Sequence, residues 1–209
     1  MAKSVTSELI MLGSAAAPGR FSFFRGFKPK AFRAGQKPRF ENTILLDPTN
    51  AAHRDMLKKL NTTAKEMVAK VGGDWADFEE GLCFGSGDKG KKSKYEGYKG
   101  HWWVSASAQA DDAPQILDRG ARVLVVDAQG REPKFPYSGC WGIMAVTLWL
   151  QDNEYGKRIN ANFKVAQFVK DDKPFSNVTQ VDVSQHFTAM EDDSPSAAGS
   201  SGGGDDFLN

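Results

Sequence analysis

The chain has 209 residues, with 27 basic and 26 acidic side chains, a net charge of +1 and 40% hydrophobic residues. This length and composition favour a single domain with a sizeable core. No apolar run approaches the roughly 18 residues of a membrane span, and polar residues interrupt any signal-peptide pattern near the N-terminus, so we expect a cytoplasmic protein without a membrane partner.

The first elements combine short strands with a strongly basic, aromatic stretch. Residues 6–12 are a candidate first strand, and residues 40–46 form the next clear one. Between them, residues 20–40 hold seven cations, interleaved phenylalanines and no acid. Phe21 and Phe23 alternate with polar neighbours as in an edge strand, so some of these rings belong to the core. A run this basic is typical of a nucleic-acid contact surface.

One long helix follows. Thr49 or Asn50 is positioned as its N-cap, and Gly72-Gly73 ends it. Its apolar face consists of Met56, Leu57, Leu60, Ala64, Met67, Val68 and Val71. We interpret this stripe as core packing rather than as a binding groove.

Residues 88–107, DKGKKSKYEGYKGHWWVSAS, change from a lysine-rich loop with two tyrosines to an apolar strand. Cations follow a phosphate backbone, and flat rings stack on unpaired bases of any identity. The stretch also fits a solvated loop before a core strand, and the remaining sequence must decide. Within residues 101–110, alternation assigns Trp102 and Val104 to the core face and leaves Trp103 on the outer one.

The later sequence is dominated by strands. Residues 123–126 are short and apolar, and residues 137–150 give the longest strand signal. Alternation there separates an aliphatic core face from a mixed face with Tyr137 and Trp141. Residues 163–169 add a strand, and residues 178–183 fit an edge. Several strands with one helix and no βαβ rhythm predict a mainly β, α+β fold built as a small antiparallel barrel.

The C-terminal residues 188–209 form an acidic tail. Five acids and no base follow His186, so the rest of the chain has 21 acids against 27 bases and carries +6, while the tail carries −5. Such segregation indicates a polyanion-binding body with an acidic arm. The tail has too little apolar surface to offset its ordering entropy, and we expect it to be disordered. The end of the tail has two acids followed by an apolar pair, a pattern typical of a segment that docks into a pocket of a partner protein. These residues are Asp205, Asp206, Phe207 and Leu208.

Candidate catalytic and metal sites are weak. Residues 85–92 approach a phosphate-binding P-loop, but Lys92 stands where a Ser or Thr hydroxyl is required. Cys83, Cys140 and the three histidines have no metal or redox spacing, so we expect reduced cysteines and no zinc site. Acid pairs such as Asp111-Asp112 and Asp171-Asp172 lie in turn-like contexts. A metal-dependent nuclease whose carboxylates meet only in space stays open as an alternative.

Three separated blocks, EGYKGHWWVSAS at 96–107, YSGCWGIMAVTLWLQDN at 137–153 and GKRINANFKVAQFVKDDKPF at 156–175, resemble a family of phage single-stranded DNA-binding proteins. Their order and spacing match, as does the helix between the second and third strands, over residues 37–175. The resemblance implies an OB-type barrel. It also implies an acidic arm that recruits replication enzymes, although here Phe207 is not terminal.

We therefore predict a sequence-tolerant single-stranded DNA-binding domain at 1–187 and a disordered acidic tail at 188–209. It would serve phage replication or recombination in the infected bacterial cell, without catalytic residue, metal or cofactor. The predicted DNA-binding residues are Arg20, Arg25, Lys28, Lys30, Arg33, Lys89, Lys91, Lys92, Lys94, Tyr95, Tyr98, Lys99, Trp103, Tyr137 and Trp141. The alternatives are a metal-dependent nuclease or recombination enzyme, and a basic adaptor for an acidic protein.

Overall fold

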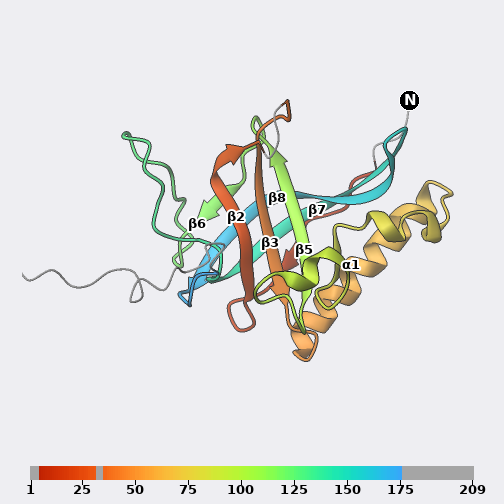
Figure 1. The fold of residues 1–209 in the computed structure, drawn as a ribbon, viewed down its shortest axis with the longest axis horizontal. Coiled ribbons are helices and arrows are strands. Elements are labelled where there is room, and N and C mark those ends of the chain that lie inside the picture. The colour runs from red at the N-terminus through yellow and green to blue at the C-terminus, as the bar shows by residue number, and fades with distance from the viewer. Residues whose placement is uncertain (1–4, 32–34, 176–209) are drawn as a thin grey trace, which may run out of the picture. The chain divides into compact units, whose positions relative to one another are not determined.

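The structure, a computed structural model, describes residues 5–31 and 35–175. Its elements in chain order are β1 (Ile10–Leu12), β2 (Gly19–Lys30), β3 (Arg39–Leu46), α1 (Ala51–Lys70), the 3-10 helices η1 (Trp75–Asp77) and η2 (Glu79–Gly81), β4 (Phe84–Ser86), the 3-10 helix η3 (Gly90–Lys94), β5 (Trp102–Gln109), β6 (Gln115–Leu117), β7 (Trp141–Asn153) and β8 (Gly156–Lys170) (Figure 1). The predicted mainly β fold with one major helix is confirmed for the described residues.

Five strands are paired in a continuous circuit. The pairings run from β2 to β3, β5, β8 and β7, and the first residues of β2 pair again with β7 through Gly19 and Arg20. Most pairs are antiparallel, but β5–β8 and β6–β8 are parallel, so the prediction of a purely antiparallel arrangement is wrong. The chain passes through β7, reverses direction in the β7–β8 hairpin, and then places β8 beside β5. There β8 runs in the same direction as β5, so this pair is parallel.

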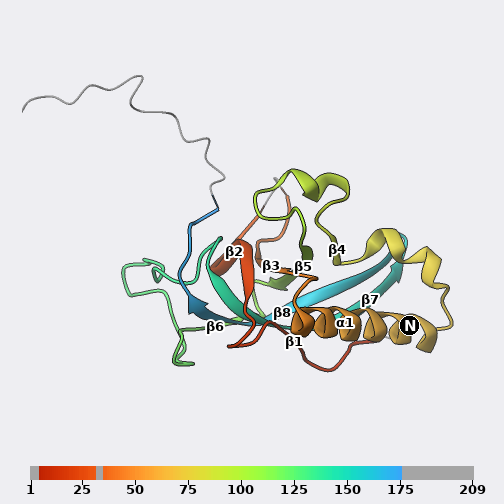
Figure 2. The ribbon, with the colours of Figure 1, turned by 90° about the horizontal axis from the view of Figure 1, so that it is seen from below.

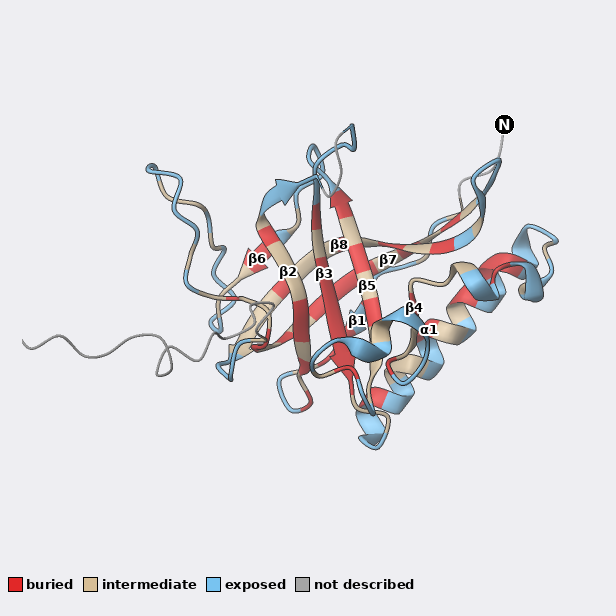
Figure 3. Ribbon diagram, in the orientation of Figure 1, coloured by how far each residue is buried: buried red, intermediate tan, exposed pale blue. Residues whose placement is uncertain are grey.

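Alternation correctly identified the core faces of the two main strands. Along β5, Val104, Ala106 and Ala108 are buried, whereas Trp103, Ser105 and Ser107 are only half-buried. Along β7, Met144, Val146, Leu148 and Leu150 are buried, whereas Trp141 and Trp149 are half-buried. Figure 3 shows the buried residues concentrated along the central strands and the facing side of α1. The outer faces of β3 and β5 are thereby left to form a surface.

The helix begins as predicted. Asn50 is its N-cap, and its side chain accepts a hydrogen bond from the backbone N–H of His53. His53, Leu60, Ala64, Met67 and Val68 are buried, whereas Val71 lies just past the helix and is exposed. In Figure 2 the helix runs along one side of the sheet and the η3 loop lies on the other, so α1 leaves that second side open.

Several element predictions need correction. Residues 123–126 form no strand beyond one bridge from Val123 to Leu117, and Val123 and Val125 are exposed. β2 is not an edge strand, and its alternation breaks where Phe23 adopts φ +52°. Residues 6–12 contribute only β1 and a bridge from Thr6 to Trp149. The predicted edge at 178–183, the boundary at 187 and the acidic tail lie outside the described residues.

Candidate nucleic-acid interface

The outer face of β3, β5, β8 and β7 forms a groove with a polar floor. The register aligns Glu41 with Ser107, Ser107 with Asn162, and Asn162 with Thr147, so one row crosses all four strands. Two cavities of about 480 and 430 Å³ lie over this face. They share the lining residues Arg39, Ser107, Trp149, Arg158 and Asn160, which makes them parts of one groove.

Lys92 of η3 reaches over the floor at one end of the groove. Its Nζ donates a hydrogen bond of 2.9 Å to Ser105 Oγ, and Ser105 Oγ lies 2.8 Å from Thr43 Oγ1. The same ammonium lies 4.3 Å from the centroid of the Trp103 ring, a cation–π contact. Lys92 therefore places a positive charge directly beside an aromatic ring within the groove.

Five aromatic rings line the groove, with Tyr155 at its β7–β8 end. Trp103 packs one part of its ring close to Gly85, and its Nε1 donates to the carbonyl oxygen of Ser86 at 3.3 Å. The Phe23 and Tyr95 rings meet edge to face with centroids 5.0 Å apart, and Tyr95 is 36% exposed. Trp149 is half-buried and lines both cavities. Phe23 has a left-handed backbone with φ +52°, and the residue lines the groove.

One carboxylate shares the floor with these groups. Glu41 is half-buried, and burial raises its pKa although the charges of Arg25, Arg39 and Lys92 act in the opposite direction. Burial also lowers the pKa of Lys92, and the charge of Glu41 partly offsets this. Both directions have the same cause, because removing a charged group from water disfavours its charged form.

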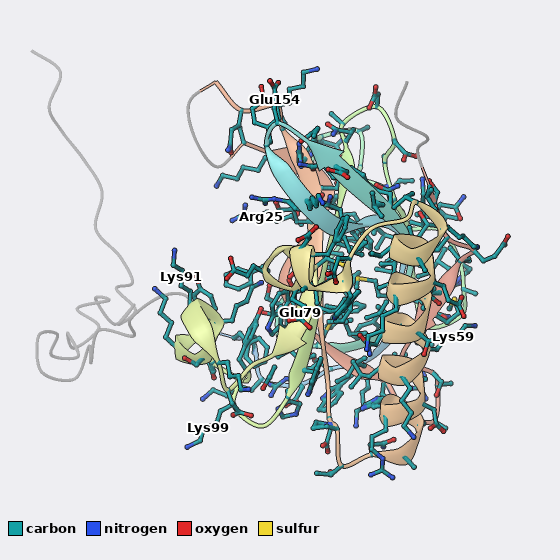
Figure 4. The ribbon with its side chains drawn as sticks, turned by 90° about the vertical axis from the view of Figure 1, so that its right-hand side faces the viewer. Arg25, Lys59, Glu79, Lys91, Lys99 and Glu154 are labelled. Carbon is teal, nitrogen blue, oxygen red and sulfur yellow. The ribbon has the colours of Figure 1, made fainter. Side chains whose placement is uncertain are left out.

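The predicted lysine loop divides into an exposed part and a groove part. Lys89, Lys91, Lys94 and Lys99 are exposed. Figure 4 shows Lys91 and Lys99 pointing away from the body, with Arg25 between Lys91 and the hairpin that carries Glu154. Only Lys92 reaches the floor. These lysines can attract a polyanion, but they do not by themselves define its path.

Tyr98 cannot stack on a base in this structure. Its side chain is completely buried, and burial raises the pKa of its hydroxyl. The loop folds back so that the Tyr98 ring packs 5.6 Å from Tyr95 and 6.4 Å from Phe23. Tyr98 thus supports the exposed Tyr95 from below, and its predicted role as a stacking platform is not retained.

Arg20, Tyr137 and Trp141 lie together in a second cluster, outside the groove lining, where they contact the chain's own acids. The Tyr137 hydroxyl donates to Asp171, and Trp141 Nε1 donates to Asp172 Oδ2 at 2.6 Å. Arg20 donates hydrogen bonds of 2.8 Å to the carbonyl oxygens of Gly139 and Lys173. Its guanidinium also forms an ion pair with Asp172 at 3.6 Å and lies 4.3 Å from the centroid of the Phe175 ring. Asp172 has a lowered pKa because the backbone N–H of Lys173 and the Trp141 ring N–H donate to its carboxylate, and the charges of Arg20 and Lys170 stabilise it further.

The remaining predicted cations of β2 are spread along its length. Lys28 Nζ donates to the Gly130 carbonyl at 2.6 Å, and Lys30 is exposed. Arg25 aligns with Glu41 in the register and so lies at the side of the groove. Arg33 lies outside the described residues.

Sequence reasoning missed four groove residues: Arg39, Trp149, Arg158 and Asn160. Arg39 belonged to the basic run and Trp149 to the mixed face of its strand, but neither was singled out. The alternation signal for Trp149 was present, because it shares a face with Trp141. Trp149 pairs with Asn160 on β8, two residues from Arg158 in the sequence. A local sequence pattern cannot predict this contact between two strands.

The described residues do not gather carboxylates for metal chemistry. No group of three or more His, Cys, Asp or Glu side chains with metal-binding geometry occurs in ranges 5–31 and 35–175. Asp112 pairs with Lys164 at 2.7 Å, while Asp171 and Asp172 hold the second cluster. Both cysteines are free thiols, and burial raises the pKa of each to about 12. Among the described helices, none has the length and apolarity to cross a membrane.

Comparison with solved structures finds proteins with a similar fold. The structure resembles the single-stranded DNA-binding protein of bacteriophage Enc34 in a C-terminally truncated form, with 27% identity, a TM-score of 0.62 and coverage of 76% of this chain and 86% of that one. It also resembles the Enc34 protein in complex with single-stranded DNA, with 24% identity, a TM-score of 0.64 and coverage of 84% and 100%.

No curated protein sequence matches the chain. A family model does match it over residues 14–196, most of its length, and that family is described as the single-stranded DNA-binding protein of Enterobacter phage Enc34. The chain therefore belongs to the Enc34 family of phage single-stranded DNA-binding proteins.

Proposed function

We propose that the protein binds single-stranded DNA in the groove over β3, β5, β8 and β7, and that it coats and protects unpaired strands during phage replication or recombination. The observation that carries this proposal is the combination of rings and cations on one open face. Tyr95, Trp103 and Trp149 supply surfaces for bases, and Arg39, Lys92 and Arg158 supply charges for phosphates.

The circuit of five strands fits an OB-type barrel whose open face carries the groove. The hairpin between β7 and β8 borders one end, where Tyr155 is 75% exposed, and the η3 loop borders the other. Aromatic rings stack on the face of any base, and basic side chains contact the phosphates that all nucleotides share. The binding would therefore tolerate most sequences. The solved Enc34 relative in complex with single-stranded DNA supports the same ligand class.

A titration with short oligonucleotides tests the proposal. Intrinsic tryptophan fluorescence should be quenched as a base approaches Trp103 or Trp149, and a gel shift should appear with and without Mg²⁺. Cleavage that requires Mg²⁺ would instead support the nuclease alternative. Neither a shift nor cleavage would support the basic adaptor.

The proposal includes a role for the acidic tail, whose sequence carries −5. An acidic arm tethered to a basic body is present at a high effective concentration, so it would compete with DNA at low salt and be released once DNA binds. Asp205, Asp206, Phe207 and Leu208, which lie outside the described residues, would then engage replication or recombination proteins of the infected cell.

Truncation tests the tail separately from the groove. Deleting residues 191–209 should tighten DNA binding, most at low salt, and abolish capture of the partner. Phe207→Ala should leave DNA affinity nearly intact and damage only recruitment. If the truncated protein binds DNA no better at low salt, the competing-arm role is wrong.

A further inference from the structure

The groove contains an acid where a phosphate-binding surface would be expected to have none. Among the described residues that line the two cavities, Glu41 and Glu80 are the only acids. Glu80 is exposed on η2, at the wall of the groove, whereas Glu41 lies on β3, in the floor. A carboxylate on the floor repels phosphates, so it needs a different partner when a strand is bound.

The position of Glu41 leaves its carboxylate available as an acceptor. Within the described ranges, no ion pair shorter than 4.0 Å and no side-chain hydrogen bond involves it. Its neighbours in the register are Arg25 on β2 and Ser107 on β5. Arg39 and Lys92 act on it only through their charges. The carboxylate is therefore half-buried in the lining of the cavity, and among the residues that the structure describes no side chain or backbone N–H donates to it.

The chemistry of the bases determines what such an acceptor recognises. An ionised carboxylate only accepts hydrogen bonds. Cytosine, adenine and guanine present exocyclic amino donors on their pairing edges, whereas thymine and uracil present carbonyl acceptors on either side of one N–H. Phosphates held by Arg39, Lys92 and Arg158 would place bases over the floor, where the edge of a base can meet Glu41. Glu41 would then accept from an amino group and repel a carbonyl.

We infer that Glu41 gives the groove a base preference, favouring bases with an exocyclic amino group, such as cytosine, over thymine or uracil at the nucleotide that lies over it. This inference rests on the proposed function and adds one selective position to an otherwise sequence-tolerant groove. The competing explanation is that Glu41 only balances the charges of Arg25, Arg39 and Lys92. In that case its removal changes the affinity for all sequences equally.

Oligo(dC) and oligo(dU) of about 12 nucleotides separate these explanations, because a site of this type covers roughly 4–16 nucleotides. The two bases have similar rings and both lack a methyl group, but only cytosine has the amino donor. Dissociation constants are measured by fluorescence anisotropy at one salt concentration for the full chain and for Glu41→Ala, Glu41→Gln and the control Glu80→Ala. Circular dichroism melting checks that each variant is folded.

We expect the unaltered protein to bind oligo(dC) about fivefold to tenfold more tightly than oligo(dU), as for one good contact to a base edge. Glu41→Ala should bring this ratio close to one. Glu41→Gln, which retains the shape and both donates and accepts, should do the same even if the alanine variant is unstable. Glu80→Ala should leave the ratio unchanged.

Two results would overturn the inference while leaving the proposed function intact. One is an unaltered protein that binds both oligonucleotides equally. The other is a Glu41→Gln variant that binds both more tightly with the same ratio, which identifies Glu41 as a counter-ion only. Failure of the unaltered protein to bind either oligonucleotide would instead refute the proposed function itself.

Discussion

The groove and the second cluster both combine cations with tryptophan, yet only the groove is open. In the groove, Lys92 lies against Trp103, and no acid of the described chain forms an ion pair with it. In the second cluster, Arg20 and Trp141 are both bound to Asp172, and the Arg20 guanidinium lies against the Phe175 ring. The comparison teaches that nearby carboxylates decide whether such a pair can bind DNA, because they compete with phosphates for the same donors.

The largest effect expected concerns the two kinds of tryptophan. Trp149→Ala should weaken binding of single-stranded DNA by about 1–3 kcal/mol, the usual contribution of a ring stacked on a base. Trp141→Ala should change the affinity by less than about twofold, a difference below 0.5 kcal/mol, and act mainly on stability through its lost contacts. Fluorescence anisotropy gives the affinities, and thermal melting gives the stabilities. Equal losses of affinity would place the second cluster on the DNA path.

The next effect separates the arginines by salt dependence. Arg39→Ala and Arg158→Ala should each reduce the slope of log affinity against log salt by about 0.7, since each removes one phosphate contact. Arg20→Ala should leave the slope unchanged, because Asp172 and two backbone carbonyls already occupy its donors. A titration at four salt concentrations measures all three slopes. An unchanged slope for Arg158→Ala would remove the β7–β8 side from the interface.

A smaller effect should follow from removing the acids of the second cluster. The double variant Asp171→Asn, Asp172→Asn frees Arg20 and Trp141 and removes two negative charges near Lys170. Exposed charges interact weakly in water, so DNA affinity at low salt should rise only about twofold to threefold, and the gain should vanish at high salt. The double variant Asp111→Asn, Asp112→Asn is the matched control, because it removes the same number of charges from another exposed acid pair. Identical gains in both variants would mean that only net charge matters.

The smallest effect is on the stability of the free protein. Burial raises the pKa of Glu41 above 4.5, so the folded state holds its proton more tightly than the unfolded state does. This stabilisation is complete below the unfolded pKa and is lost as pH rises through the folded pKa. Glu41→Gln should therefore raise the melting temperature at neutral pH by about 2 °C or less, and the difference should shrink in acid. A constant difference across pH would contradict this cause.

Local pattern determined the elements that have a strict period. The faces of β5 and β7 followed from alternation, because a strand with one buried face admits a single assignment of its side chains. The start of α1 followed from Asn50, because the helix leaves N–H groups that a capping side chain must accept. The three sequence blocks likewise determined the family, since their order and spacing agree over most of the chain.

Tertiary structure alone decided which rings face a ligand. Trp141 and Trp149 lie on the same face of β7, but β8 pairs Trp149 with Asn160 and Trp141 with Lys170, next to Asp172. Tyr98 reads like Tyr95 in sequence, yet the loop buries it completely. Partners across a sheet come from residues distant in the chain, so alternation fixes the face on which a side chain lies, and only the fold fixes its neighbours.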